Sequence, residues 1–113
     1  MTEAQLHRAV AVYLRLVLRS PTIWTTIGHG GGGRVRGAML KAKGLKAGWP
    51  DIIIIHPEFA DKIVLGIELK TKKGKPSPDQ LGVVRQFELA NCKMVFCRSL
   101  DDVKFELEQA GII

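Results

Sequence analysis

An uninterrupted run of four isoleucines, residues 52 to 55, is the feature that most constrains how this chain can fold. Such a run is typical of a strand, and because side chains alternate between the two faces of a strand, this one needs cover on both faces. Asp51 comes directly before the run, and a second apolar strand, predicted over residues 64 to 70, carries Glu68 and Lys70. We therefore expect the middle of a mixed or parallel sheet, with charged side chains on two adjacent strands.

Glu68 and Lys70 are two residues apart in the second strand, so they point to the same face, while their apolar neighbours point to the other. Charged groups in an apolar strand are costly unless a partner compensates them, and a metal ion is one such partner. The alternative is an ion pair on an exposed face, with Asp51 serving only as a turn residue. The apolar neighbouring strand favours a covered sheet and therefore the first interpretation.

The chain has 113 residues, 46% of them hydrophobic, which predicts one domain over residues 1–113 with a modest core. No apolar run approaches the roughly 18 residues of a membrane span, and the longest candidate, residues 9 to 18, is broken by Arg15. The first residues, Met1-Thr2-Glu3, do not resemble a secretion signal. We expect a cytoplasmic protein without a membrane partner.

Cysteine and histidine usage argues against a disulfide scaffold and against a zinc site. Cys92 and Cys97 are too few for a scaffold, and we expect both to be buried, reduced thiols. The histidines, His7, His29 and His56, are scattered and lack the spacing of zinc ligands. We interpret all three as incidental.

Positive charge is concentrated in one part of the chain. No acid occurs between Glu3 and Asp51, while that stretch contains eight Lys and Arg residues, and the net charge is +6 with a pI near 9.6. This asymmetry favours a polyanionic partner, although a solvated basic surface is the simpler alternative. Phosphate contacts position DNA without reading its sequence, so structure-selective binding is expected. The candidate phosphate-binding residues are Arg34, Arg36, Lys41, Lys43, Lys46, Lys72, Lys73 and Lys75.

Periodicity and capping signals predict the order helix, strand, helix, strand, strand, helix, strand, helix. Ser77 followed by Pro78 and Gln80 is a strong helix start, and the first helix is expected to end at Ser20-Pro21. The glycine tract over residues 28 to 33 predicts a flexible loop that lacks the ending of a phosphate-binding P-loop. The sequence leaves open whether this loop is a flap that contacts DNA or a simple tether. The expected elements span residues 2 to 20, 22 to 27, 34 to 43, 51 to 55, 64 to 70, 77 to 90, 93 to 97 and 99 to 110.

Pro50-Asp51 followed by Glu68-Leu69-Lys70 resembles the PD-(D/E)XK motif of restriction-endonuclease-like nucleases. With Glu3, Gly48-Trp49 and Gln80 added, the chain resembles the VRR-NUC (virus-type replication-repair nuclease) family from Glu3 to the final helix. The resemblance implies an α/β fold with a restriction-endonuclease-like core, in which helices flank a mixed central sheet. It also implies a metal-dependent nuclease of phage or bacterial origin, in stand-alone form a homodimer acting on branched DNA such as Holliday junctions or flaps. The glycine tract is not part of this signature.

The residue types suit phosphodiester hydrolysis, which needs an activated water and stabilisation of phosphoryl charge. Mg²⁺ takes oxygen ligands and keeps several waters, so Asp51 and Glu68 are the expected metal ligands, with Mn²⁺ expected to substitute. By resemblance, Glu3 and the backbone carbonyl of Leu69 complete the ligand set. Lys70 could orient or deprotonate the attacking water or stabilise transition-state charge, and the sequence does not choose between these roles.

Two members of this set have structural alternatives. Gln80 sits where its side chain could reach the catalytic site or cap its own helix. Glu3 lies in the first turn of a helix, where the helix dipole favours an acid whatever the function, and only the family pattern favours a metal ligand.

Three functions follow from these observations. The first is a Mg²⁺- or Mn²⁺-dependent DNA endonuclease in which Asp51, Glu68, Lys70 and Gln80 form the catalytic set. The second is a non-catalytic DNA-binding module of the same fold, which would not need carboxylates facing phosphates. The third is a structural subunit of a phage assembly, which predicts a large exposed apolar patch. Because so small a chain can span only one scissile phosphate, paired cuts across a junction predict a homodimer.

Overall fold

The computed structural model describes residues 1–27, 33–58 and 61–113, and within these ranges the chain forms four helices and four strands in the predicted order. Strands β1, β2 and β3 pair antiparallel in sequence, and β4 pairs parallel to β3, so the sheet is mixed as expected. The predicted α/β class is thereby confirmed. The elements are α1 (Glu3–Val17), β1 (Ile23–Thr26), α2 (Gly33–Ala42), β2 (Ile52–Pro57), β3 (Lys62–Leu69), α3 (Pro78–Leu89), β4 (Lys93–Cys97) and α4 (Leu100–Gln109).

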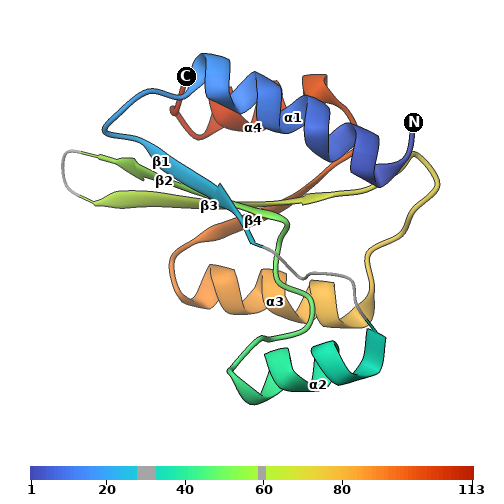
Figure 1. Cartoon of the computed structure of the whole chain (residues 1–113). Coiled ribbons are helices and arrows are strands. Elements are labelled where there is room, and N and C mark those ends of the chain that lie inside the picture. Colours follow the sequence, from blue (N-terminus) through green and yellow to red (C-terminus); the bar gives the residue numbers. More distant parts are fainter. Residues whose placement is uncertain (28–32, 59–60) are drawn as a thin grey trace.

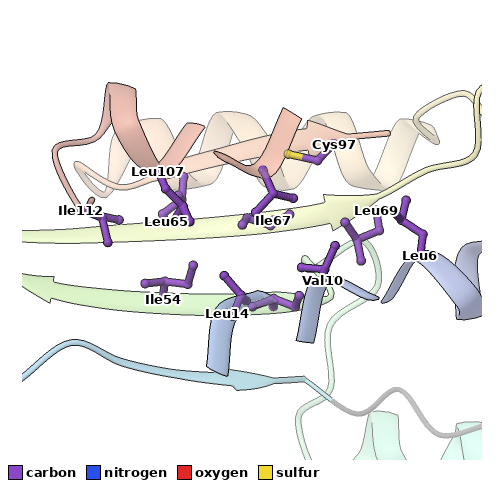
Figure 2. Packing of buried hydrophobic residues seen from close by; sticks show 12 residues of the cluster. Leu6, Val10, Leu14, Ile54, Leu65, Ile67, Leu69, Cys97, Leu107 and Ile112 are labelled. Atoms are coloured by element: carbon purple, nitrogen blue, oxygen red, sulfur yellow. The ribbon is translucent and has the colours of Figure 1, made fainter. Parts of the chain in front are cut away.

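The sheet lies between two layers of helices (Figure 1). Helices α1 and α4 cover one face, α3 covers the other, and α2 lies on the far side of α3 from the sheet (Figure 1). The main core lies under α1 and α4, where Leu6, Val10 and Leu14 of α1 meet the apolar side chains of β2 and β3 (Figure 2). A smaller cluster under α3 is centred on Val83 and Phe87.

The isoleucine strand β2 is central, between β1 and β3, but its two faces are not covered equally. Ile52 and Ile54 are fully buried in the main core, whereas Ile53 and Ile55 are only half-buried. Helix α3 packs chiefly on β4, and among the described residues of β2 only Ile53 joins the cluster of Val83, Phe87 and Met94. The strand therefore has the central position that we expected. Ile53 and Ile55, however, are less buried than the prediction of cover on both faces requires.

Helix α1 begins as predicted and ends earlier than predicted. Thr2 and Gln5 form a reciprocal capping box, in which each side chain accepts a hydrogen bond from the other residue's backbone N–H. The helix ends at Val17 and Leu18 is already extended, although we expected helix as far as Ser20. The residue before a proline is disfavoured in helical conformation, and the chain needs the residues before Pro21 to turn back into the sheet.

Several other sequence predictions have outcomes here. Cys97 is fully buried and its burial raises the pKa of the thiol to about 12, whereas Cys92 is only half-buried, which corrects the prediction that both are buried. Gly33 begins α2, and the remainder of the glycine tract, with His29, lies outside the described residues. Within the described ranges, none of the helices has the length and apolar character needed to cross a bilayer.

Candidate active site

Glu68 is the one charged or polar residue that is buried in the described part of the chain, with 6% of its surface exposed. It lies on β3, and the strand alternation that buries Ile67 and Leu69 in the main core turns Glu68 toward the α3 face. The alternative of an ion pair on an exposed face is therefore wrong. A buried acid on an interior strand is costly and calls for compensating partners.

Asp51 is brought to Glu68 by the antiparallel register of β2 and β3. Ile52 pairs with Ile67 in this register, so the preceding Asp51 is aligned with Glu68, the next residue of β3. The Asp51 carboxylate is fixed there because its Oδ2 accepts a hydrogen bond of 2.8 Å from the backbone N–H of Leu69. Asp51 precedes the paired residues of β2, and this hydrogen bond holds its side chain at the end of β3.

The chain that leads into Asp51 approaches two other elements closely. Gly48 has a φ of +86°, and a Cβ there would lie 2.6 Å from backbone atoms of Asp79 at the start of α3. Pro50 is buried over Gly66, where a Cβ would lie 2.6 Å from the proline Cγ. Glycine at both positions lets the lead-in to Asp51 pack between the sheet and the start of α3.

Lys70 and Gln80 both reach the Oε2 atom of Glu68. The Lys70 Nζ lies 3.7 Å away, and the Gln80 Nε2 donates a hydrogen bond of 2.9 Å. The Gln80 Oε1 also accepts a bond of 2.9 Å from the backbone N–H of Ser77, which completes the capping box of α3. The two alternatives for Gln80 therefore hold together, since one amide caps its helix through its oxygen and contacts Glu68 through its nitrogen.

The electrostatics of this cluster are unbalanced toward negative charge. The pKa of Glu68 is raised from 4.5 to about 7, first by burial and then by the neighbouring carboxylate of Asp51, with a smaller contribution from Glu3. The ammonium of Lys70 acts in the opposite direction without cancelling these effects. An additional cation between Asp51 and Glu68 would stabilise both carboxylates in their charged form.

The donor set suits a hard divalent cation. No three acidic, histidine or cysteine side chains converge on one point in the ranges that the structure describes, so Glu3 does not complete a cluster with Asp51 and Glu68. Mg²⁺ needs only one or two carboxylates, because water fills the rest of its octahedral shell. Two carboxylates beside Lys70 and Gln80 fit this requirement. The assignment of Glu3 and the Leu69 carbonyl as further ligands stays a prediction.

The predicted phosphate-binding residues fall into two groups, and all of them are exposed. The first group lies in the connection between β3 and α3 and comprises Lys72, Lys73 and Lys75. The second group lies on α2 or in the connection to β2, and comprises Arg34, Arg36, Lys41, Lys43 and Lys46. The first group is two to five residues past Lys70 and therefore follows Glu68 closely in the sequence.

Arg98 was not predicted from the sequence. Its Nη1 donates hydrogen bonds to the carbonyl oxygens of Thr71 at 2.5 Å, Gly74 at 2.6 Å and Lys72 at 3.2 Å. The available signal was its place after β4: in the parallel register Cys97 pairs with Leu69, so the residues that follow these two strands emerge side by side. The sequence shows this only once the pairing of β3 with β4 is known.

Comparison with known proteins supports the fold. No family model matches the chain, and no match occurs among curated proteins. A solved structure described as "VRR_NUC domain protein" has a TM-score of 0.71 and 21% identity over 97% of this chain and 88% of that one. A second, described as "VRR_NUC domain", has a TM-score of 0.62 and 16% identity over 96% of this chain and 97% of that one. The chain therefore has the fold of VRR_NUC domain structures, as its sequence resemblance predicts.

Proposed function

We propose that this chain is a metal-dependent DNA endonuclease of the VRR-NUC type, which hydrolyses phosphodiester bonds in branched DNA such as a Holliday junction or a flap. The observation that carries the proposal is the buried Glu68, aligned with Asp51 and contacted by Lys70 and Gln80, on a nuclease-type fold. A carboxylate destabilised in this way does not stabilise a structural core, whereas a site that binds a cation and a phosphate requires such a group.

Each residue has a defined part in this proposal. Asp51 and Glu68 would hold Mg²⁺ or Mn²⁺, and Glu3 and the Leu69 carbonyl are the further ligands that the family resemblance implies, although the Glu3 carboxylate does not converge on this pair in the structure. A metal held by these residues would supply activation of the attacking water and neutralisation of charge on the phosphoryl oxygens. Lys70 places its ammonium beside the same carboxylate, where it can orient the attacking water or stabilise charge that develops on the phosphate.

The substrate class follows from charge. The net charge of +6 and the exposed lysines after the catalytic strand favour a polyanion, and such contacts read backbone shape and not base sequence. Selectivity for branched DNA, paired action of two copies and a cytoplasmic location remain proposals.

The test is cleavage of end-labelled four-way junction, flap, single-stranded and linear duplex DNA in Mg²⁺, Mn²⁺ or EDTA. We expect metal-dependent cutting that Asp51→Asn reduces by at least about a hundredfold, because it removes one of two charged ligands. The matched control is Asp61→Asn. Asp61 is exposed and directly precedes the first residue of β3, at the end of the strand away from Glu68, so this variant should cut normally. Binding without cutting in either metal would replace the proposal with the non-catalytic DNA-binding module.

A further inference from the structure

A cavity of about 660 Å³ lies at the end of the sheet where β3 and β4 finish, and its lining includes the residues that directly follow Lys70 in the chain. Its walls come from the start of α1, from the residues that follow Lys70 and from the junction between β4 and α4. Figure 1 draws the N-terminal end of α1 and the connection after β3 at the same edge of the molecule. The charged side chains in its lining are Lys72, Lys73, Arg98 and Asp101.

The charge of this cavity is mainly positive. Lys72, Lys73 and Arg98 contribute three cations, and Asp101 contributes the one carboxylate of the lining. Both lysines are exposed, whereas Arg98 is partly buried in the wall. Most of the lining is apolar, and the charged groups within it, three cations to one carboxylate, suit an anion and not a second metal ion.

Arg98 is held rigidly through a single nitrogen. The three carbonyl oxygens that accept from its Nη1 belong to the turn of residues 71 to 74, so the guanidinium also fixes the backbone that carries Lys72 and Lys73. A guanidinium orders its donors in one plane, and anchoring one nitrogen sets the direction of the others.

The other guanidinium nitrogens of Arg98 retain their capacity to donate. In the ranges that the structure describes, Nε and Nη2 make no hydrogen bond to protein, and neither is a buried atom without a partner. The Asp102 carboxylate accepts from the backbone N–H of Arg98 at 2.8 Å, and among the described residues the Arg98 guanidinium forms no ion pair. A fixed, charged fork with free donors is the preferred protein receptor for a phosphate.

We infer that Arg98, with Lys72 and Lys73, forms a second phosphate site that holds a backbone phosphate of the DNA strand next to the scissile one. This inference rests on the proposed function, because Lys72 follows Lys70 by two residues and the site would align the strand that is cut. Its ligand is the phosphodiester group itself, so the site contributes affinity and position without base preference.

The experiment measures DNA binding in EDTA, so that it does not depend on cleavage. Fluorescence anisotropy of a labelled four-way junction is recorded for the full chain over a series of salt concentrations. We expect Arg98→Gln to weaken binding about tenfold and to reduce the slope of log affinity against log salt by about 1, the signature of one lost phosphate contact. Arg98→Lys keeps the charge but not the fork, and should recover only part of the affinity.

Two further variants separate a phosphate contact from a structural or general charge effect. Lys73→Gln changes an exposed side chain and should also reduce the salt slope by about 1 while the thermal unfolding midpoint stays unchanged. Arg85→Gln removes one charge from the exposed face of α3 and should leave affinity within about twofold of wild type.

Either of two results would overturn the second phosphate site: wild-type affinity and salt slope in both Arg98→Gln and Lys73→Gln, or losses no larger than in Arg85→Gln. Reduced binding by Arg98→Gln with a lower unfolding midpoint, together with unchanged binding by Lys73→Gln, would leave Arg98 a structural role and also overturn it. Failure of the nuclease proposal has a different signature, since all proteins would then bind DNA and none would cut it.

Discussion

At the scale of single residues, Glu68 combines a structural cost with a functional use. Burial and the charges of Asp51 and Glu3 raise its pKa to about 7, so the ionised form is destabilised in the folded chain. At the proposed metal site, stability and metal binding would be coupled, because a cation there would relieve the same repulsion that destabilises the folded chain.

This coupling predicts the pH dependence of the free energy of unfolding in EDTA. Glu68 has a pKa near 4.5 when unfolded and about 7 when folded, so between these values the folded chain binds the extra proton. Its contribution to stability is therefore fully present below about pH 4.5 and is lost as pH rises to about 7, with a total of up to about 3 kcal/mol.

The control is Glu68→Gln, which removes the titrating group and keeps an oxygen that can accept from Gln80. The difference in unfolding free energy between wild type and variant, measured by urea denaturation across this range, isolates the contribution of Glu68. We expect the variant to be the more stable protein at pH 8 in EDTA and to lack metal-dependent cleavage. A pH-independent difference would contradict the raised pKa.

The two contacts of Gln80 use different atoms of one amide, so we expect its effect on cleavage and its effect on stability to be separable by mutation. Gln80→Glu keeps an oxygen for the Ser77 N–H but places a like charge against Glu68, whereas Gln80→Ala loses both contacts. We expect both variants to lose about tenfold or more in cleavage rate, and only Gln80→Ala to lose about 1 kcal/mol of stability through the cap. Normal cleavage by Gln80→Glu would reduce Gln80 to a capping residue.

The residues of the site differ in how far the sequence could predict them. Asp51, Glu68, Lys70 and Gln80 are visible because each has a local signal, either charge against an apolar strand or a helix start. Arg98 has no local signal, because its role depends on the parallel pairing of β4 with β3 and on three backbone carbonyls. Side chains that act on backbone are the hardest to identify from sequence.

At the scale of elements, the site depends on how closely the lead-in to β2 approaches the start of α3. Gly48→Ala puts a Cβ 2.6 Å from the backbone of Asp79 and forces an alanine to a φ of +86°. We expect a loss of about 2 kcal/mol or more in unfolding free energy, with reduced cleavage because Asp51 is displaced. The measurements are urea denaturation and initial cleavage rate.

The matched control for Gly48→Ala is Gly82→Ala, since Gly82 lies within α3 and an added Cβ would meet nothing within 4 Å. Removing a glycine from a helix interior should stabilise the chain by about 0.5–1 kcal/mol and leave cleavage unchanged. If both alanine variants behaved alike, close approach at Gly48 would not be what positions Asp51.

Element type and order could be predicted because periodicity and caps are local, as the capping boxes at Thr2 and Ser77 show. The early end of α1 and the unequal burial of the isoleucines could not be predicted from the sequence, because both depend on where the helices pack. Figure 1 shows α2 on the far side of α3 from the sheet, and the pattern of a short basic helix does not indicate that position.

At the scale of the whole molecule, the chain carries one carboxylate pair around one buried acid in its described part. One such site can cut one strand, so symmetric paired cuts at a four-way junction need two copies related by a twofold axis. We therefore predict a homodimer at micromolar concentration, measured as a mass near twice 12.5 kDa by analytical ultracentrifugation.

Mixing wild type with an equal amount of Asp51→Asn before adding a supercoiled cruciform plasmid tests the functional dimer. Paired cuts that linearise the plasmid should fall to roughly a quarter while single nicks accumulate, because random pairing leaves about one active dimer in four. A protein that sediments as a monomer at this concentration and still linearises the plasmid in one binding event would contradict the prediction.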